Sequence, residues 1–259
     1  MSGSIDQYKN MGIRYPWVTD YLNKKDDFWD DNSLGSEMVK SLRSFLRHAQ
    51  VIDKNGVTTF GEKISVMGGN SEIGWALMLC NLVYTPQFNW WALNVQFNKQ
   101  YSQFELDEIL KDYVSSNYSR KNIISGFKSI FFTNPVLSER IGFGVVNVKT
   151  KGNNTYLEAA YRKSWQPPDP RVILYSLYKF AEACGDMHQF SLETLLDDSI
   201  ERDGVSPTRI FGLDKETMIP LLNGLSANYP NFISVSFTLG LDSITLRPDK
   251  KSEDVLDLF

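Results

Sequence analysis

The stretch LGSEMVKSLRSFLRHAQVIDKNGVT, residues 34–58, carries the strongest indication of local fold in this chain. From Asn32–Ser36, which supply helix-start residues, to Gln50 it has the periodicity of an amphipathic helix, with one apolar face. The neighbouring face carries Lys40, Arg43 and Arg47. Asn55-Gly56 between β-branched residues is typical of a tight β-hairpin. A helix followed by a tight hairpin is the order of a winged helix.

The basic face of this helix has two interpretations. Ser41 and Ser44 adjoin the three cations, and short side chains allow a helix backbone to approach DNA closely. Lys54 adds a cation in the turn that follows. The ordinary alternative is a solvated basic face, which many amphipathic helices have. We predict DNA contact here and keep the alternative open.

The whole chain predicts a mainly helical α+β fold. Beyond residue 171, Ser191, Ser206 and Asp214 are expected to start helices, and the alternation from Ile233 to Leu246 predicts a final hairpin with its turn at Gly240. This repeats the helix–helix–helix–hairpin order. We therefore expect two winged-helix-like units, joined by an aromatic-rich helical segment and a short β-hairpin. The expected parts are a winged-helix-like unit at 1–70, a helical segment at 71–134, a basic hairpin and Pro-rich boundary at 135–170, a second winged-helix-like unit at 171–247 and an acidic, mobile tail at 248–259.

Charge is unevenly distributed along the chain, whose net charge is −4. Residues 1–119 carry −3, residues 120–163 carry +6 and residues 164–259 carry −7. A basic middle between acidic flanks suits a local phosphate-binding surface. Cations before the helix near residue 123 and around the hairpin tip at 149–154 are further candidates for DNA contact, and we expect all candidates to form one exposed patch. These additional candidates are Arg120, Lys121, Lys149, Lys151, Arg162 and Lys163.

The aromatic residues of the second segment also have two interpretations. Trp75, Phe88, Trp90, Trp91, Phe97, Tyr101 and Phe104 lie close together in the sequence. Aromatic side chains can stack on unpaired bases. Since these residues alternate with leucines rather than with Lys and Arg, we expect most of them in the core.

Several classes of protein are excluded or disfavoured by composition. Two histidines are too few for a His-rich zinc site, and Cys80 and Cys184 have no CxxC spacing, so buried thiols are expected rather than a disulfide or metal pair. No long apolar run predicts a membrane span, and no secretory signal is visible, so we expect a cytoplasmic protein. No nucleotide-binding GxxxxGK[ST] loop is present.

Carboxylates for a metal-dependent nuclease gather in two acidic stretches, and we interpret both as solvated loop or cap clusters. They are Asp26, Asp27, Asp30 and Asp31, and Asp197, Asp198, Glu201 and Asp203. Catalytic residues and metal ligands are therefore left unassigned.

Three stretches resemble the SspB-type protein family, which is encoded beside sulfurtransferases similar to PAPS reductase. They are residues 34–43, residues 168–177 with their Pro-Asp-Pro, and SPTRIFGLD at residues 206–214. Their order and spacing agree with the family over nearly the whole chain. The chain differs where family members often have a His-Glu pair near the N-terminus, since it has Tyr8-Lys9-Asn10-Met11.

The resemblance implies a component that engages or nicks DNA in bacterial DNA phosphorothioate modification, a phage-defence system. The implied partners are DNA, the PAPS-reductase-like sulfurtransferase, a cysteine desulfurase and an ATPase. A nickase would need Mg²⁺ or Mn²⁺. Two alternatives stay open, namely a non-catalytic adaptor that places the sulfurtransferase on DNA and a winged-helix transcriptional regulator. The sequence leaves homodimer formation open.

Overall fold

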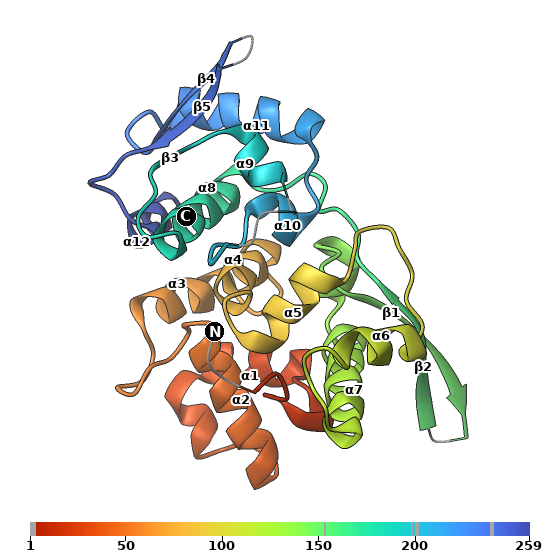
Figure 1. The fold of residues 1–259 in the computed structure, drawn as a ribbon. Helices are drawn as coiled ribbons and strands as arrows, with labels where there is room; N and C mark the ends of the chain where they lie inside the picture. The colour runs from red at the N-terminus through yellow and green to blue at the C-terminus, as the bar shows by residue number, and fades with distance from the viewer. Residues whose placement is uncertain (1–3, 153, 198, 200–201, 239–240) are drawn as a thin grey trace. The chain divides into compact units, whose positions relative to one another are not determined.

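The structure, a computed structural model, describes residues 4–152, 154–197, 199, 202–238 and 241–259. The chain divides into two compact units, Met1–Lys163 (unit 1) and Ser164–Phe259 (unit 2). Helices predominate and the sheets are small and antiparallel, so the predicted mainly helical α+β fold is confirmed (Figure 1). The parts that the sequence separates as 1–70 and 71–134, together with most of 135–170, share unit 1.

Unit 1 is built of helices followed by one hairpin. In chain order its elements are η1 (Lys9–Met11), α1 (Tyr15–Lys24), η2 (Lys25–Trp29), α2 (Ser36–His48), α3 (Thr59–Met67), α4 (Glu72–Leu82), α5 (Pro86–Asn94), α6 (Gln103–Leu110), α7 (Asn117–Thr133), η3 (Val136–Arg140), β1 (Val145–Lys151) and β2 (Asn154–Tyr161). No helix in the described ranges is both long and apolar enough to cross a membrane.

Local sequence fixes where several of these helices begin. The side chains of Thr58, Ser71, Ser102 and Ser116 each accept a hydrogen bond from the backbone N–H three residues further on. Helix α2 has no such cap, since Gly35 precedes it, and it ends at His48, two residues before the predicted end at Gln50.

The core of unit 1 is aromatic and surrounds α4, which is buried at every position from Gly74 to Leu82. Trp91 is fully buried, lies 4.7 Å from Phe127 between ring centroids, and donates its indole N–H to the carbonyl of Phe143 at 2.8 Å. The prediction that most aromatic residues of this segment belong to the core is confirmed. Phe104 differs from the others, because its side chain is 70% exposed.

Two glycines allow η1 to pack directly on α7. A Cβ at Gly12 would lie 2.4 Å from the carbonyl oxygen of Gly126, and a Cβ at Gly126 would lie 2.6 Å from the carbonyl oxygen of Lys9. Real Cβ atoms do not approach so closely, and Gly12 also has a positive φ of 57°. The chain therefore crosses α7 backbone against backbone, and this crossing places Tyr8 in the core.

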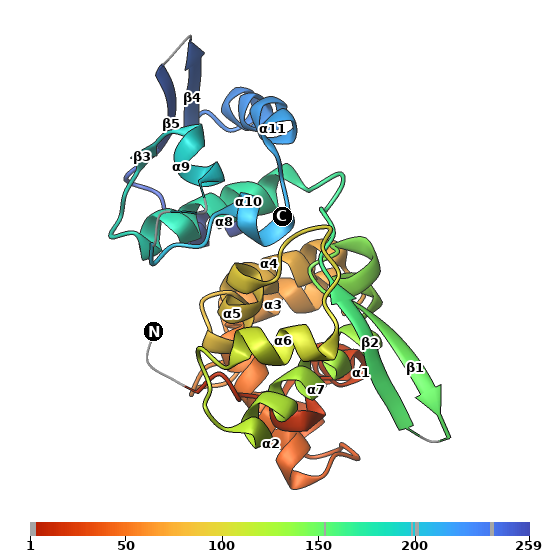
Figure 2. The ribbon, with the colours of Figure 1, turned by 45° about the vertical axis from the view of Figure 1, so that its right-hand side comes forward.

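The hairpin β1–β2 projects from the body of unit 1 in both views (Figures 1 and 2). Its strands are antiparallel with a bulge at Asn147/Val148, and they are longer than predicted because the cations at 149 and 151 lie within β1. The base of β2 is held by reciprocal backbone hydrogen bonds between Tyr101 and Ala160. Asn153, in the predicted tip, lies outside the described residues.

Unit 2 contains α8 (Pro170–Ala183), β3 (Gln189–Phe190), α9 (Leu192–Leu196), α10 (Pro207–Phe211), α11 (Lys215–Asn228), β4 (Ile233–Thr238), β5 (Leu241–Leu246), α12 (Ser252–Val255) and η4 (Leu256–Leu258). The sheet is antiparallel with the order β3-β5-β4. Ser191, Ser206 and Asp214 cap α9, α10 and α11, as predicted. Gly240, the predicted turn residue, lies outside the described residues.

The last residues of unit 2 correct the prediction of a mobile tail. Val255 and Leu256 are buried against the rest of the unit. The Glu182 carboxylate accepts hydrogen bonds from the backbone N–H and hydroxyl of Ser252, at 2.8 and 3.0 Å, and Arg171 donates to the carbonyl of Leu258 at 3.0 Å. The apolar residues of the predicted mobile tail instead fill the core beside α8.

Candidate nucleic-acid interface

Helix α2 presents one face to the core and a basic face to solvent. Leu42, Phe45 and Leu46 are at most 1% exposed, as the periodicity predicts. Ser44 is half-buried beside the cations, but Ser41 is only 7% exposed and belongs to the buried side. The basic surface is therefore narrower than predicted.

Lys40 lies at the N-terminal end of this surface and is paired with a carboxylate. Its ammonium group lies 2.7 Å from Glu37 Oε1, and Lys9 reaches Glu37 Oε2 at 3.4 Å. Hydrogen bonds from Lys40 and Lys9 hold the pKa of Glu37 below its ordinary value. The side chain of Lys40 is 73% exposed, so the pair is open to water and to exchange for a phosphate.

Arg43 is positioned by an aromatic ring. Its guanidinium carbon lies 3.9 Å from the centroid of Trp29, and Trp29 packs against Tyr21 with ring centroids 5.0 Å apart. A guanidinium stacked on an indole loses little freedom when its N–H groups bind a further acceptor. The contact of Trp29 with Arg43 could not be predicted from periodicity, because Trp29 lies in η2 and Arg43 in the separate helix α2.

The side chain of Arg47 is exposed and makes no ion pair or hydrogen bond within the part of the chain that the structure describes. The turn after α2 contains the exposed Lys54 and is closed by the hydrogen bond from Asp53 N–H to Gly56 O at 2.9 Å. The predicted hairpin is present only as a single bridge between Ile52 and Val57.

The ring of His48, at the end of α2, is hydrogen-bonded to a buried residue. Its Nδ1 lies 2.8 Å from the hydroxyl oxygen of Tyr8, and burial lowers the pKa of His48. Burial disfavours the charged form of this ring, so the basic surface ends at Arg47.

Arg120 was predicted on the surface and lies in the interior instead. Its Nε donates to Asp107 Oδ1 at 2.9 Å, and one terminal nitrogen donates to the carbonyls of Val114 and Ser115 at 3.0 and 2.8 Å. The Arg120 side chain is 8% exposed. It joins the α6–α7 connection to α6 and has no face left for DNA.

Arg162 is likewise buried, with 1% exposure. A terminal nitrogen donates to the carbonyls of Ala92 and Val95 at 2.8 and 3.3 Å. Its guanidinium carbon lies 4.0 Å from the ring centroid of Phe97 and 4.9 Å from that of Phe143. The prediction of a surface contact is wrong, since this cation holds the end of α5 to the base of the hairpin.

The other predicted cations of the basic middle are exposed. Lys149 faces Tyr156 across the hairpin, and Lys151 follows on the same strand. Lys163 lies 5.5 Å from the ring centroid of Tyr161. Lys121 is exposed on α7, which lies between α2 and the hairpin in both views (Figures 1 and 2). The exposed cations are thus distributed over α2, α7 and the hairpin, and the single exposed patch that we expected lacks Arg120 and Arg162, which are buried.

The two acidic stretches are only partly among the residues that the structure describes. Asp26, Asp27, Asp30 and Asp31 lie in and just after η2, while Asp198 and Glu201 are outside the described residues. Among the residues that are described, no group of three His, Cys, Asp or Glu side chains could hold a metal ion.

Comparison with known proteins adds no relative: no protein-family model, no curated protein and no solved structure matches this chain. The resemblance to the SspB-type family therefore stays a prediction.

Proposed function

We propose that this protein binds duplex DNA through the exposed side of α2. The observation that carries the proposal is that Lys40, Arg43 and Arg47 lie at helical spacing on the side of α2 next to the face that buries Leu42 and Leu46. Residues three or four apart are neighbours on a helix surface, and Lys and Arg side chains are among the groups that contact DNA phosphates and position a protein on the duplex.

The order of elements supports a recognition role for α2. Helices α1, η2 and α2 precede the turn at 52–57, which is the helix–helix–helix–hairpin order of a winged helix. In helix-turn-helix proteins the last helix of the motif enters the major groove. We infer that unit 1 begins with a winged-helix-like unit whose wing is reduced to the turn that carries Lys54.

Unit 2 has the same order of elements without the basic face. Helices α8, α9, α10 and α11 precede the hairpin β4–β5. Exposed charges on α11 are Lys215 and Glu216 in its first turn, while its exposed residues further on are uncharged, and residues 164–259 carry −7 in total. A surface of this charge repels DNA, so we assign protein contact to unit 2.

These assignments fit a DNA-engaging component of a phosphorothioate modification system, in which unit 2 would meet the sulfurtransferase. The resemblance of residues 34–43 and 206–214 to the SspB-type family supplies that context. The contacts at α2 support DNA binding itself and do not depend on the system.

The test measures affinity for a fluorescent duplex over a series of salt concentrations. Each lost phosphate contact reduces the slope of log K against log[salt] by about 0.9. Arg47→Ala should therefore reduce the slope by about one and Arg43→Ala/Arg47→Ala by about two. Lys215→Ala, at an exposed cation of unit 2, is the control.

An unchanged slope for Arg47→Ala would overturn the proposal, and a reduced slope for Lys215→Ala would move the DNA surface to unit 2. Supercoiled plasmid incubated with the protein and Mg²⁺ or Mn²⁺, against an EDTA control, then separates the remaining alternatives. Relaxation that needs the metal identifies a nicking component, and intact plasmid leaves the adaptor and the transcriptional regulator, of which only the regulator should bind one duplex sequence tightly in preference to others.

A further inference from the structure

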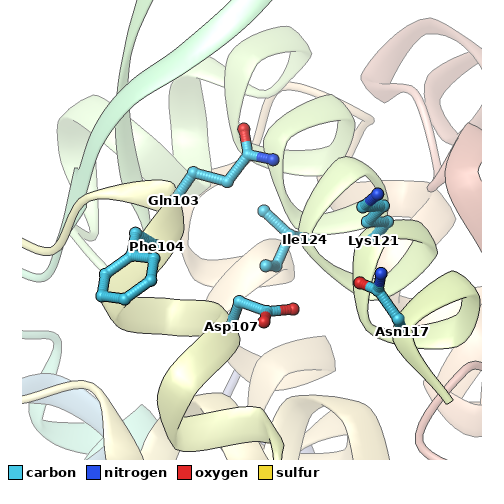
Figure 3. Close-up of a pocket in the computed structure, with 6 residues that line it drawn as sticks. All are labelled: Gln103, Phe104, Asp107, Asn117, Lys121 and Ile124. Atoms are coloured by element: carbon cyan, nitrogen blue, oxygen red, sulfur yellow. The ribbon is translucent and has the colours of Figure 1, made fainter.

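An open groove of about 340 Å³ lies between α6 and α7, apart from the surface of α2 (Figure 3). It is lined by Gln103, Phe104, Asp107, Asn117, Lys121 and Ile124. Its volume is at the lower end of the range for small-ligand sites, about 300–1,000 Å³. The groove therefore has room for one nucleotide-sized group.

The apolar residues that line the groove are the buried Ile124 and the exposed Phe104. Ile124 is 3% exposed and lies between the two helices in Figure 3. Phe104 comes from the first turn of α6 and is 70% exposed, although Leu106 and Leu110 of the same helix are buried. A phenyl face left in water beside a groove is suited to stacking on a flat ring.

Two amide side chains stand on opposite sides of the groove. In Figure 3 the Gln103 amide extends from α6 toward α7, and Asn117 lies on the facing helix. Neither makes a hydrogen bond within the described part of the chain. An amide presents both donors and an acceptor, which are the groups that pair with the edge of a nucleobase.

The charges of the groove favour an anion. The Asp107 carboxylate is already bound by Arg120, whose Nε lies 2.9 Å from Oδ1 and whose second terminal nitrogen lies 3.4 Å from Oδ2. Lys121 is exposed and has no ion pair among the described residues. One uncompensated ammonium group is the complement of one phosphate.

We propose that this groove binds a single unpaired nucleotide of DNA. The base stacks on Phe104, its edge pairs with Gln103 and Asn117, and its phosphate contacts Lys121. The inference rests on the proposed DNA binding, since a strand held at α2 supplies the nucleotide. A free nucleotide has the same chemistry and is the alternative source.

The experiment compares three short duplexes of one sequence: fully paired, with one extra unpaired deoxyadenosine, and with an abasic residue at that bulge. Stacking of a base on an aromatic side chain is expected to raise the affinity for the deoxyadenosine bulge by roughly tenfold or more over the paired duplex. The abasic bulge should show no gain. Phe104→Ala should abolish the gain. The control, Tyr118→Ala, removes a ring that is 74% exposed on α7 but does not line the groove, and should keep the gain.

Equal affinity of the wild-type protein for the bulged and paired duplexes would overturn the inference, as would a gain that survives Phe104→Ala. Binding of free deoxyadenosine monophosphate that depends on Phe104, without a bulge effect, would assign the groove to a free nucleotide and also overturn it. Failure of the proposed function looks different, because the paired duplex would not bind at all. In that case Phe104-dependent binding of single-stranded oligodeoxyadenosine tests the groove alone.

Discussion

Replacing Arg162 with alanine should destabilise unit 1 without changing contact to DNA. The substitution removes a charged donor from the carbonyl of Ala92 at 2.8 Å, and hydrogen bonds of charged groups contribute about 1.5–3 kcal/mol. It also removes a cation stacked 4.0 Å from the ring of Phe97, a contact that contributes about 0.5–1 kcal/mol at an exposed site and more when it is shielded from water. We expect a loss of about 3 kcal/mol in the free energy of unfolding.

A loss of that size is readily measured by thermal denaturation. In a domain of 150–250 residues each kcal/mol shifts Tm by about 2–4 °C, so Arg162→Ala should unfold about 6–12 °C earlier. Arg47→Ala is the matched control, since its side chain is exposed and surface substitutions change stability by about 0.5 kcal/mol or less. An unchanged Tm for Arg162→Ala, together with a reduced salt slope of DNA binding, would refute the assignment of this residue to the interior.

Three further outcomes are expected. Burial lowers the pKa of His48 below that of the unfolded chain, so its contribution to the free energy of unfolding should be complete above a pH of about 6.5 and decline as the pH falls through and below that value. His48→Gln should therefore reduce the pH dependence of the free energy of unfolding measured from pH 7 to 5. Arg120→Ala should cost about 2–3 kcal/mol in urea denaturation, less than a fully buried ion pair, because its carboxylate partner keeps 23% exposure; no loss would mean that the pair is solvated. Removing residues 252–259 should cost unit 2 about 3–5 kcal/mol, since Val255 and Leu256 are buried, and an unchanged urea midpoint would restore the interpretation as a free tail.

Local patterns in the sequence predicted the local elements well. Ser191, Ser206 and Asp214 cap helices as expected, and the buried face of α2 follows its period. These features depend on residues within one or two turns of each other. Burial of the aromatic segment could also be predicted, because its partners in sequence are apolar.

The fate of individual cations could not be predicted in the same way. Arg162 donates to carbonyls 70 and 67 residues earlier in the chain. Because every residue has a backbone carbonyl, the sequence does not indicate which ones accept a hydrogen bond from this arginine. Arg120 pairs with Asp107 thirteen residues away, across a helix–helix connection whose geometry no period describes. Net charge by segment therefore overstated the cations available in residues 120–163.

The crossing of η1 over α7 affects how mutational scans of this protein should be interpreted. A side chain at Gly12 or at Gly126 would collide with the backbone of the other segment. Neither position therefore tolerates a larger residue, and a change at one cannot compensate a change at the other. A scan would record two intolerant sites more than a hundred residues apart, in the pattern usually attributed to shared activity. Their cause is steric, and intolerance at these two positions carries no information about the ligand.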